Sequence, residues 1–574
     1  MQIAKYGFYE ARFSAEIARN PFDVQFSVNV TCPDGTMKTV CGFYDGGNTF
    51  AFRFMPEAEG VYKYVTVCKT AKLNGLTGSF KCISGNDCNH GKVSVKNKFW
   101  FSYADGTPFF QAGTTCYAWI HQSKELRTQT LNTLSLGYFN KLRMCVFPKW
   151  YEYNDRQPEL FPFEGSVQSG FDYDRLNVEF FRHIEKCVGE LAALGIEADV
   201  ILFHPYESQD WRFNYMTRTQ DERYLRYIIS RLSAYHNVWW SLANEYDLLK
   251  TGYKRKVAAW KRLIKFVHDN DPYGHPVSIH QLKRLFDHRN KYLSHCSIQR
   301  TDMYLTAEHT DTWREIYGKP VIIDECVYEG NLNAWWGGIT AEELVRRFWE
   351  AAVRGGYLGH SETYYDVSGN IWWSHGGVLH GKSAERIKFL REVMDECPNT
   401  SFTSESGTNN IARAIAGTDT QLIYFGNYQP YRYMLNLLGG GKYRIIIIDT
   451  WNMEITELSD LRTGTTEIEL PTKPFMAILC IAAEQGKKTP FTRDSVFEEM
   501  KLTSCGHRFL RLLKRLIPAY YSGLLQMTIT QCSKLSGGKL DGKAGDGILR
   551  IANENVFWRG LWQIIVYSLF RRRR

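Results

Sequence analysis

The stretch Asn237-Val-Trp-Trp-Ser-Leu-Ala-Asn-Glu-Tyr-Asp247 combines an apolar segment with an abrupt change to polar residues. Its apolar run, Val238 to Ala243, is short and bounded by polar residues, which is typical of a strand buried on both faces. The run ends in Asn244-Glu245, an amide beside a carboxylate. Enzymes built on barrels carry their chemistry at the carboxyl ends of such strands, so Glu245 is a candidate catalytic acid.

A second stretch with the same pattern is Lys319-Pro-Val-Ile-Ile-Asp-Glu-Cys326, whose apolar run ends in the carboxylate of Glu325. If the two runs are the fourth and seventh strands of a barrel, Glu245 and Glu325 lie across its mouth from one another. Glycoside hydrolysis requires two carboxylates that face each other across a sugar, one as acid and the other as nucleophile or base. The alternative for either residue alone is a structural ion pair at a strand end.

The surrounding sequence predicts the barrel itself. From residue 99 onward, strand-like runs alternate with longer amphipathic segments such as 176–194 and 341–354, which indicates a βα barrel or a doubly wound sheet. Eight candidate strands favour the α/β class and a (β/α)8 TIM barrel. The predicted strands are Phe109–Thr114, Lys141–Phe147, Glu197–Phe203, Val238–Ala243, Val277–His280, His295–Gln299, Pro320–Asp324 and Gly356–His360.

Segments on both sides of the barrel read as β-structure. Alternating residues such as Val24–Val30, separated by turn signals such as Pro33-Asp-Gly35, predict a small β-sandwich before the barrel, and the pattern returns after it. The end of the chain continues neither pattern. The predicted domains are an N-terminal β-sandwich at 1–90, the catalytic barrel at 91–400, a C-terminal β-sandwich at 401–484 and an irregular tail of unknown role at 485–574.

Composition and termini limit the partners and the location that we expect. The formal net charge is +9, but part of it comes from the Arg571–Arg574 run, so we expect no broad basic face and no nucleic-acid partner. The start, Met1–Gly7, has no apolar core of a signal peptide, and the apolar run Gly560–Phe570 is too short to span a bilayer. The sequence therefore predicts a cytoplasmic protein that does not bind membranes, and it indicates no oligomeric state.

Other strand ends supply polar and aromatic side chains that suit a carbohydrate substrate. Sugar hydroxyls need hydrogen-bonding groups and a sugar face can stack on an aromatic ring, although each such residue alone is more often structural. Arg143 lies within the second predicted strand, where a buried cation needs a carboxylate, and Glu325 is the candidate partner. The predicted substrate-binding residues are Trp119, Arg143, His204, His280, Gln299, His360, Glu362 and Trp373.

Seven stretches resemble, in order, those of a known enzyme group: Ala104–Phe110, Gly113–Trp119, Phe203–Tyr206, Trp239–Asp247, Gly359–Tyr364, Trp372–Gly377 and Asp449–Met453. The chain resembles the clan A retaining glycoside hydrolases and, more closely, a bacterial apiosidase-like group with a sandwich on each side of a glycosidase barrel. The resemblance covers residues 1 to about 484. It implies that Glu245 is the acid/base, that Glu325 is the nucleophile, and that Asn244 binds the hydroxyl beside the anomeric carbon.

Two other functions remain open at this point, and the glycosidase reading requires no cofactor. A metal-dependent barrel hydrolase would use His204, His280 and His360 as ligands, but the chain has neither an HxH pair on the first predicted strand nor an HExxH motif. A non-catalytic carbohydrate-binding protein on the same fold would keep its function after Glu245→Gln. The glycosidase reading predicts instead that turnover is lost while binding is retained.

Overall fold

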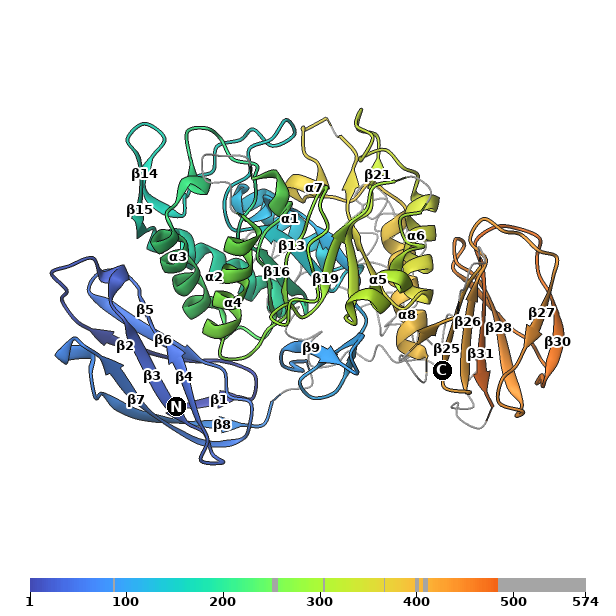
Figure 1. Ribbon diagram of the computed structural model, residues 1–574, viewed down its shortest axis with the longest axis horizontal. Coiled ribbons are helices and arrows are strands. Elements are labelled where there is room, and N and C mark those ends of the chain that lie inside the picture. Colours follow the sequence, from blue (N-terminus) through green and yellow to red (C-terminus); the bar gives the residue numbers. More distant parts are fainter. Residues whose placement is uncertain are drawn as a thin grey trace, which may run out of the picture. The chain divides into compact units, whose positions relative to one another are not determined.

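The computed structural model describes residues 1–85, 88–249, 256–302, 305–365, 367–397, 402–405 and 411–483, all within the compact unit Met1–Ser504. The predicted tail, 485–574, lies outside these residues. The described chain contains a parallel barrel with β-sheets before and after it in sequence (Figure 1). In this part of the chain, no helix is long and apolar enough to cross a membrane.

An eight-stranded parallel sheet forms the barrel, which is nearly closed (Figure 1). The strand order is β18-β17-β16-β13-β12-β22-β20-β19, so the first strand, β12, pairs with the last, β22. This arrangement confirms the predicted fold class. The sheet stops between β18 and β19, the two ends of the order. The strands are β12 Gly113–Thr115, β13 Lys141–Cys145, β16 Glu197–Ile201, β17 Val238–Ser241, β18 Val277–Ser278, β19 Cys296–Gln299, β20 Val321–Glu325 and β22 Tyr357–His360.

The first and fifth strands are half as long as predicted, and the bounds of the other strands differ from the predictions by one or two residues. Pro108–Phe109, which overlaps the first predicted strand at Phe109, forms β11 of a separate sheet with β10 (Trp100–Tyr103) and β9 (Val93–Lys96), and β12 begins only at Gly113. The fifth, predicted at Val277–His280, ends at Ser278, although His280 N still donates to Ala243 O at 3.0 Å.

Helices connect most of the barrel strands. Polar residues begin several of them: Ser123, Asn177, Thr217 and Thr340 each accept a hydrogen bond from the first turn. The connection from β18 to β19, residues 279–295, is fully described and contains no helix. The helices are α1 Lys124–Leu134, α2 Val178–Ala193, α3 Arg218–Leu232, α4 Val257–Asn270, α5 Thr310–Tyr317, α6 Ala341–Val353, α7 Trp372–His375 and α8 Ser383–Glu396.

Before β9, the chain forms two sheets, one with the order β1-β8-β7-β3-β4 and one with the order β2-β6-β5. Alternate residues of their strands, such as Phe26, Val28 and Val30, point into a shared apolar core with Phe52 and Phe80. The strands are β1 Gln2–Ala4, β2 Tyr9–Ser14, β3 Phe26–Thr31, β4 Met37–Cys41, β5 Phe43–Tyr44, β6 Thr49–Phe54, β7 Gly60–Cys68 and β8 Thr77–Ile83.

A six-stranded sheet, β24-β25-β26-β31-β28-β29, and the pair β27-β30 follow the barrel. Leu435 and Ile468 of the pair share an apolar cluster with Ile423, Ile445 and Ile478 of the larger sheet. The strands are β24 Thr403–Ser404, β25 Ala412–Ala416, β26 Thr420–Tyr424, β27 Arg432–Asn436, β28 Tyr443–Asp449, β29 Glu454–Glu457, β30 Thr465–Glu469 and β31 Met476–Ala482.

Charged side chains fill part of the barrel interior below the strand ends. Lys141 Nζ lies 2.9 Å from Asp199 Oδ2 and 3.4 Å from Asp324 Oδ1, and Arg143 Nε lies 3.9 Å from Asp199 Oδ2. Burial alone would raise the pKa of Asp324, but Lys141 and Arg143 outweigh burial and hold that pKa below its usual value. Two cations and two anions thus balance one another, as buried charges must.

Candidate active site

Glu245 occupies an unusual backbone conformation just after β17. Its φ of 46° and ψ of 53° are left-handed, which costs a residue with a side chain about 1 kcal/mol or more. Neighbouring hydrogen bonds hold the turn: Asn244 N donates to Phe203 O at 2.9 Å, and Tyr246 N donates to His280 O at 2.9 Å. Such strain is frequent at functional sites, where it points a side chain in a direction that a regular strand would not allow.

The carboxyl group of Glu245 lies in a dry environment. The residue is 4% exposed, and the hydroxyl of Tyr206 donates a hydrogen bond to its Oε2. Burial, followed by the charge of Glu325, raises the pKa of Glu245, and Tyr206, Lys149 and Gln299 act in the opposite direction; the net result is a pKa of about 7. Near neutral pH, Glu245 therefore holds a proton that it can donate.

Glu325 ends β20 and is surrounded by hydrogen-bond donors and positive charge. The hydroxyl of Tyr117 donates to its Oε1, and Arg143 Nη1 lies 3.7 Å from the same oxygen. His280 Nε2 lies 3.9 Å from this oxygen and has no hydrogen-bond partner among the described residues. Burial, together with the charge of Glu325, raises the pKa of Tyr117 well above its usual value, so this tyrosine remains a donor. These neighbours present hydrogen-bond donors and positive charge to one oxygen of Glu325.

His280 connects the two carboxylates. Its Nδ1 accepts the backbone N–H of Glu245 at 3.4 Å, which leaves the proton of a neutral ring on Nε2, the atom that faces Glu325. Burial lowers the pKa of His280 well below its usual value, so the ring is neutral. Asn244 also lies at the centre, with its Oδ1 3.3 Å from the Tyr117 hydroxyl, and Gln299 is opposite Glu325 in the β19–β20 register.

The structure therefore brings together Glu245, Glu325, Asn244, His280, Gln299 and Arg143. It also places Trp373 at this centre, 5.5 Å from the ring of Tyr117 and nearly perpendicular to it. Of the residues predicted from sequence, these seven have contacts that suit a shared ligand site.

The other four predicted binding residues contact different parts of the protein. His204 Nε2 donates to Phe147 O at 3.0 Å and its Nδ1 accepts Tyr206 N at 3.1 Å, so His204 orients Tyr206 rather than facing a ligand. His360 contacts Thr114, Glu362 accepts backbone N–H groups of the following loop, and Trp119 is fully buried. These contacts give no support to direct substrate binding by the four side chains.

Sequence reasoning assigned no role to three residues of this site: Tyr117, Tyr206 and Lys149. Both tyrosines lie in stretches that follow barrel strands, Gly113–Trp119 after β12 and Phe203–Tyr206 after β16, and that position was the available signal. Lys149 follows β13 in an apolar and aromatic stretch and resembles an ordinary loop cation in sequence.

Within the residues that the structure describes, no group of three His, Cys, Asp or Glu side chains is arranged to hold a metal ion. His204, His280 and His360, the ligands that a metal-dependent hydrolase would need, each contact a different group of protein atoms.

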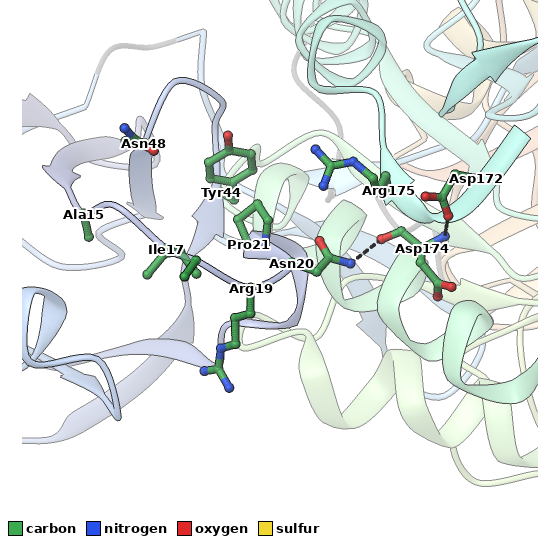
Figure 2. Close-up of a pocket in the computed structure, with 11 residues that line it drawn as sticks. Ala15, Ile17, Arg19, Asn20, Pro21, Tyr44, Asn48, Asp172, Asp174 and Arg175 are labelled. Atoms are coloured by element: carbon green, nitrogen blue, oxygen red, sulfur yellow. Dashed lines mark hydrogen bonds between the residues drawn. The ribbon is translucent and has the colours of Figure 1, made fainter.

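A separate cavity of about 480 Å³ lies beside the hairpin of β14 (Phe163–Ser166) and β15 (Gly170–Leu176) and includes none of the residues above. Figure 2 shows Asn20 directed toward Asp174, whose backbone oxygen accepts the Asn20 amide at 2.8 Å. Polar side chains around this cavity join the N-terminal segment to the hairpin, and the cavity includes neither Glu245 nor Glu325. The candidate active site is therefore the pair of carboxylates at the barrel mouth.

A parallel barrel with two buried carboxylates at the carboxyl ends of its fourth and seventh strands defines a protein of the glycoside hydrolase class. The chain belongs to the apiosidase-like catalytic domain family, which matches residues 95–399. Residues 2–69 and 410–480 match two families described as domains of unknown function.

Solved structures agree with this assignment. A candidate glycoside hydrolase from Bacteroides vulgatus ATCC 8482 is 35% identical, with a TM-score of 0.79, over 84% of this chain and 100% of that one. A family 5 glycoside hydrolase from the same organism has the same fold, with a TM-score of 0.56 and 16% identity over 71% of this chain and 98% of that one. No curated protein matches the chain.

Proposed function

We propose that this chain is a retaining glycoside hydrolase that cleaves O-glycosidic bonds of oligosaccharides or glycosides, with Glu245 as acid/base and Glu325 as nucleophile. The difference between the two carboxylates carries this proposal. Burial and the charge of Glu325 raise the pKa of Glu245 to about 7, whereas Glu325 itself receives a hydrogen bond from Tyr117 and lies near Arg143 and His280. Two carboxyl groups with environments that separate their protonation states are the signature of an acid and a nucleophile.

In the first step, a carboxylate oxygen of Glu325 forms a bond to the anomeric carbon while the bond to the leaving oxygen breaks. Glu245 donates its proton to that oxygen, so the departing alcohol is neutral and the sugar remains as an ester of Glu325. In the second step, Glu245, now a carboxylate, takes a proton from water as the water oxygen attacks the anomeric carbon. Glu325 leaves, and the configuration at the anomeric carbon is retained after two inversions.

Three neighbours assist these steps. Asn244 lies beside the Tyr117 hydroxyl and is positioned to bind the sugar hydroxyl next to the anomeric carbon, an interaction that strengthens in the transition state. Arg143 and His280 stabilise the charge of Glu325 before attack and its return as leaving group. Trp373 presents a ring at the same centre.

Paired variants with added azide test the assignment. In Glu245→Ala, a glycoside with a poor leaving group should lose about 10²–10⁴-fold in kcat/KM, whereas an activated aryl glycoside still forms the ester. Azide should then restore turnover and give a glycosyl azide of retained configuration. In Glu325→Ala, azide should instead replace the nucleophile and give the inverted glycosyl azide.

Three outcomes contradict specific parts of the proposal. If Glu245→Ala gave the inverted glycosyl azide and Glu325→Ala gave the retained one, the roles of the two residues would be reversed. Direct release of the inverted sugar by wild type would exclude the covalent step. Glu245→Gln that retains both binding and physiological function would favour a non-catalytic carbohydrate-binding protein. A matched control is Glu385→Gln, a change in the first turn of α8 at which no loss of turnover is expected.

A further inference from the structure

A buried lysine that the mechanism above does not use lies between the two carboxylates. Lys149 is only 2% exposed. Its Nζ lies 3.8 Å from the ring centroid of Tyr117, 4.6 Å from that of Tyr206 and 4.2 Å from that of Trp373. The rings thus form an aromatic cage around the ammonium group, and cation–π attraction explains how a charged group is tolerated at this depth.

Two walls of the cage are the tyrosines that hydrogen-bond the candidate catalytic groups. The Tyr117 hydroxyl donates to Glu325, and the Tyr206 hydroxyl donates to Glu245. One ammonium group therefore contacts the ring faces of both donors. Among the described residues, no carboxylate lies within ion-pair distance of Lys149 Nζ, so its charge is not neutralised by a direct partner.

The charge acts on the carboxylates at slightly longer range. Burial lowers the pKa of Lys149, whereas Cys145, Glu325 and Glu245 act in the opposite direction and Arg143 adds to the lowering. The titratable and charged groups that face Lys149 are Arg143 and Cys145 on β13, Tyr117 after β12, Tyr151 on its own loop, Tyr206 after β16, Glu245 after β17 and Glu325 on β20.

We propose that Lys149 is a positioning residue whose caged ammonium orients both tyrosine donors and stabilises the state with one negative charge shared by Glu245 and Glu325. The aromatic faces hold the cation without cancelling it, so its charge offsets the cost of burying one carboxylate charge in this site. This role rests on the proposed function of the two carboxylates, and it adds to that function a group that sets the working pH range.

The pH dependence of kcat/KM tests the proposal, with Lys149→Met as the main variant. Methionine keeps the packing against the rings and removes the charge. A nearby positive charge favours an ionised carboxylate, so its loss raises the pKa of Glu245. The basic limb of the profile should therefore move to higher pH by about one pH unit. Lys149→Arg, which keeps the charge, should restore the wild-type limb.

A merely structural lysine predicts a different result: a lower rate at every pH with the basic limb unchanged, and this result would overturn the proposal. Lys319→Met is the matched control. It removes another lysine, at the opposite end of the strand that carries Glu325, whose Nζ donates to the backbone oxygens of Asn290 and Leu293. We expect no movement of the limbs. If Lys149→Met fails to fold, Lys149→Gln gives the same comparison.

A measurement without substrate separates this proposal from the proposed function. In infrared difference titrations of the full chain, the carboxyl band that disappears in Glu245→Gln reports the protonation of Glu245. That band should titrate at higher pH in Lys149→Met than in wild type. If the shift occurs but no glycoside is cleaved, the proposed function fails and the role of Lys149 stands; an unchanged titration overturns that role.

Discussion

At the residue scale, the active site depends on two carboxylates with opposite surroundings. Glu245 is buried against the Tyr206 hydroxyl, and Glu325 is approached by Tyr117, Arg143 and His280. Three of these four partners, Tyr206, Tyr117 and His280, lie in loops that follow other strands, so the surroundings of the two carboxylates depend on the assembled barrel and not on either strand alone. Three predictions follow from the environment of Glu245.

The wild-type rate should decrease as pH rises through about 7. Glu245 must carry a proton to act as the acid, and its pKa is raised to about 7, so the basic limb of kcat/KM lies near that value. The measurement is the pH profile of kcat/KM on a cleaved glycoside. A profile in which kcat/KM does not decrease near pH 7 would contradict the assignment of Glu245.

Tyr206→Phe should move that basic limb upward. The tyrosine hydroxyl donates to Glu245 and lowers its pKa, so its removal raises the pKa of Glu245 and extends activity to higher pH by up to about one unit. The same pH profile checks the shift. Tyr215→Phe, an exposed tyrosine in the same connection, is the control and should leave the limb in place.

Glu245→Gln should stabilise the protein at high pH. The folded-state pKa of about 7 exceeds the reference value of 4.5, so the contribution of Glu245 to stability is greatest below 4.5 and decreases as pH rises to about 7. Glutamine avoids this loss, and the gain should be on the order of 1–3 kcal/mol at pH 8. Thermal unfolding at pH 8 and pH 4 provides the measurement and its control, because the gain should vanish at pH 4.

At the element scale, the barrel strands could be located because most of them lie in short apolar runs with polar residues at the end. The apolar runs 238–243 and 320–324 correspond to β17 and β20, and the carboxylates follow or end them as expected. The partners of these carboxylates were not predictable, because they depend on how loops fold back over the barrel mouth. Lys149 shows this most clearly: it follows β13, and its cage is built from residues after β12 and β16 and from α7.

Glu362 also shows that the contacts of a side chain in a loop cannot be predicted from sequence alone. It was expected to bind substrate, but it accepts the backbone N–H groups of His380 and Gly381, and Glu329 accepts those of Lys382 and Ser383. The two carboxylates are register partners in the β21–β23 pair (Glu329–Gly330 with Glu362–Thr363). Together they bind four successive amides at the beginning of α8, where the helix dipole favours negative charge.

Glu329→Gln should therefore loosen the beginning of α8. Lys382, at the N-cap, contributes no side-chain hydrogen bond, so Glu329 supplies the cap from another element. An amide has one acceptor oxygen in place of two, and the loss should be about 1–3 kcal/mol in the free energy of unfolding. Chemical denaturation measures it, with exposed Glu385→Gln on α8 as the control; equal stability of the two variants would contradict the capping role.

At the scale of the whole molecule, buried ion pairs join the N-terminal sheets to the barrel helices. Arg231 of α3 contacts Asp45 at 2.9 Å and also Glu185 of α2, and Arg53 of β6 contacts Glu185 at 2.6 Å. Arg231 and Asp45 are each almost completely buried. Removal of one member of such a network leaves opposite charges unpaired in an apolar setting, which is more costly than loss of a surface ion pair.

Arg231→Met should therefore destabilise the protein by about 3–5 kcal/mol and make the N-terminal sheets unfold separately from the barrel. Differential scanning calorimetry should show an earlier transition that wild type lacks. Arg182→Met is the matched control, because Arg182 also binds Asp45 but its side chain is 42% exposed. That variant should cost at most about 1 kcal/mol. Equal effects of the two changes would show that the interface does not depend on the buried pair.

The gap in the barrel sheet between β18 and β19 affects where this protein begins to unfold. A fully closed barrel has no edge from which its strands can peel away, whereas this one has two, and one of them is the two-residue strand β18. Amide hydrogens along this seam should exchange with solvent before those of β13 and β16, which have barrel neighbours on both sides. Since His280 follows β18 directly, the first opening of the barrel would also remove the ring that links Glu245 to Glu325.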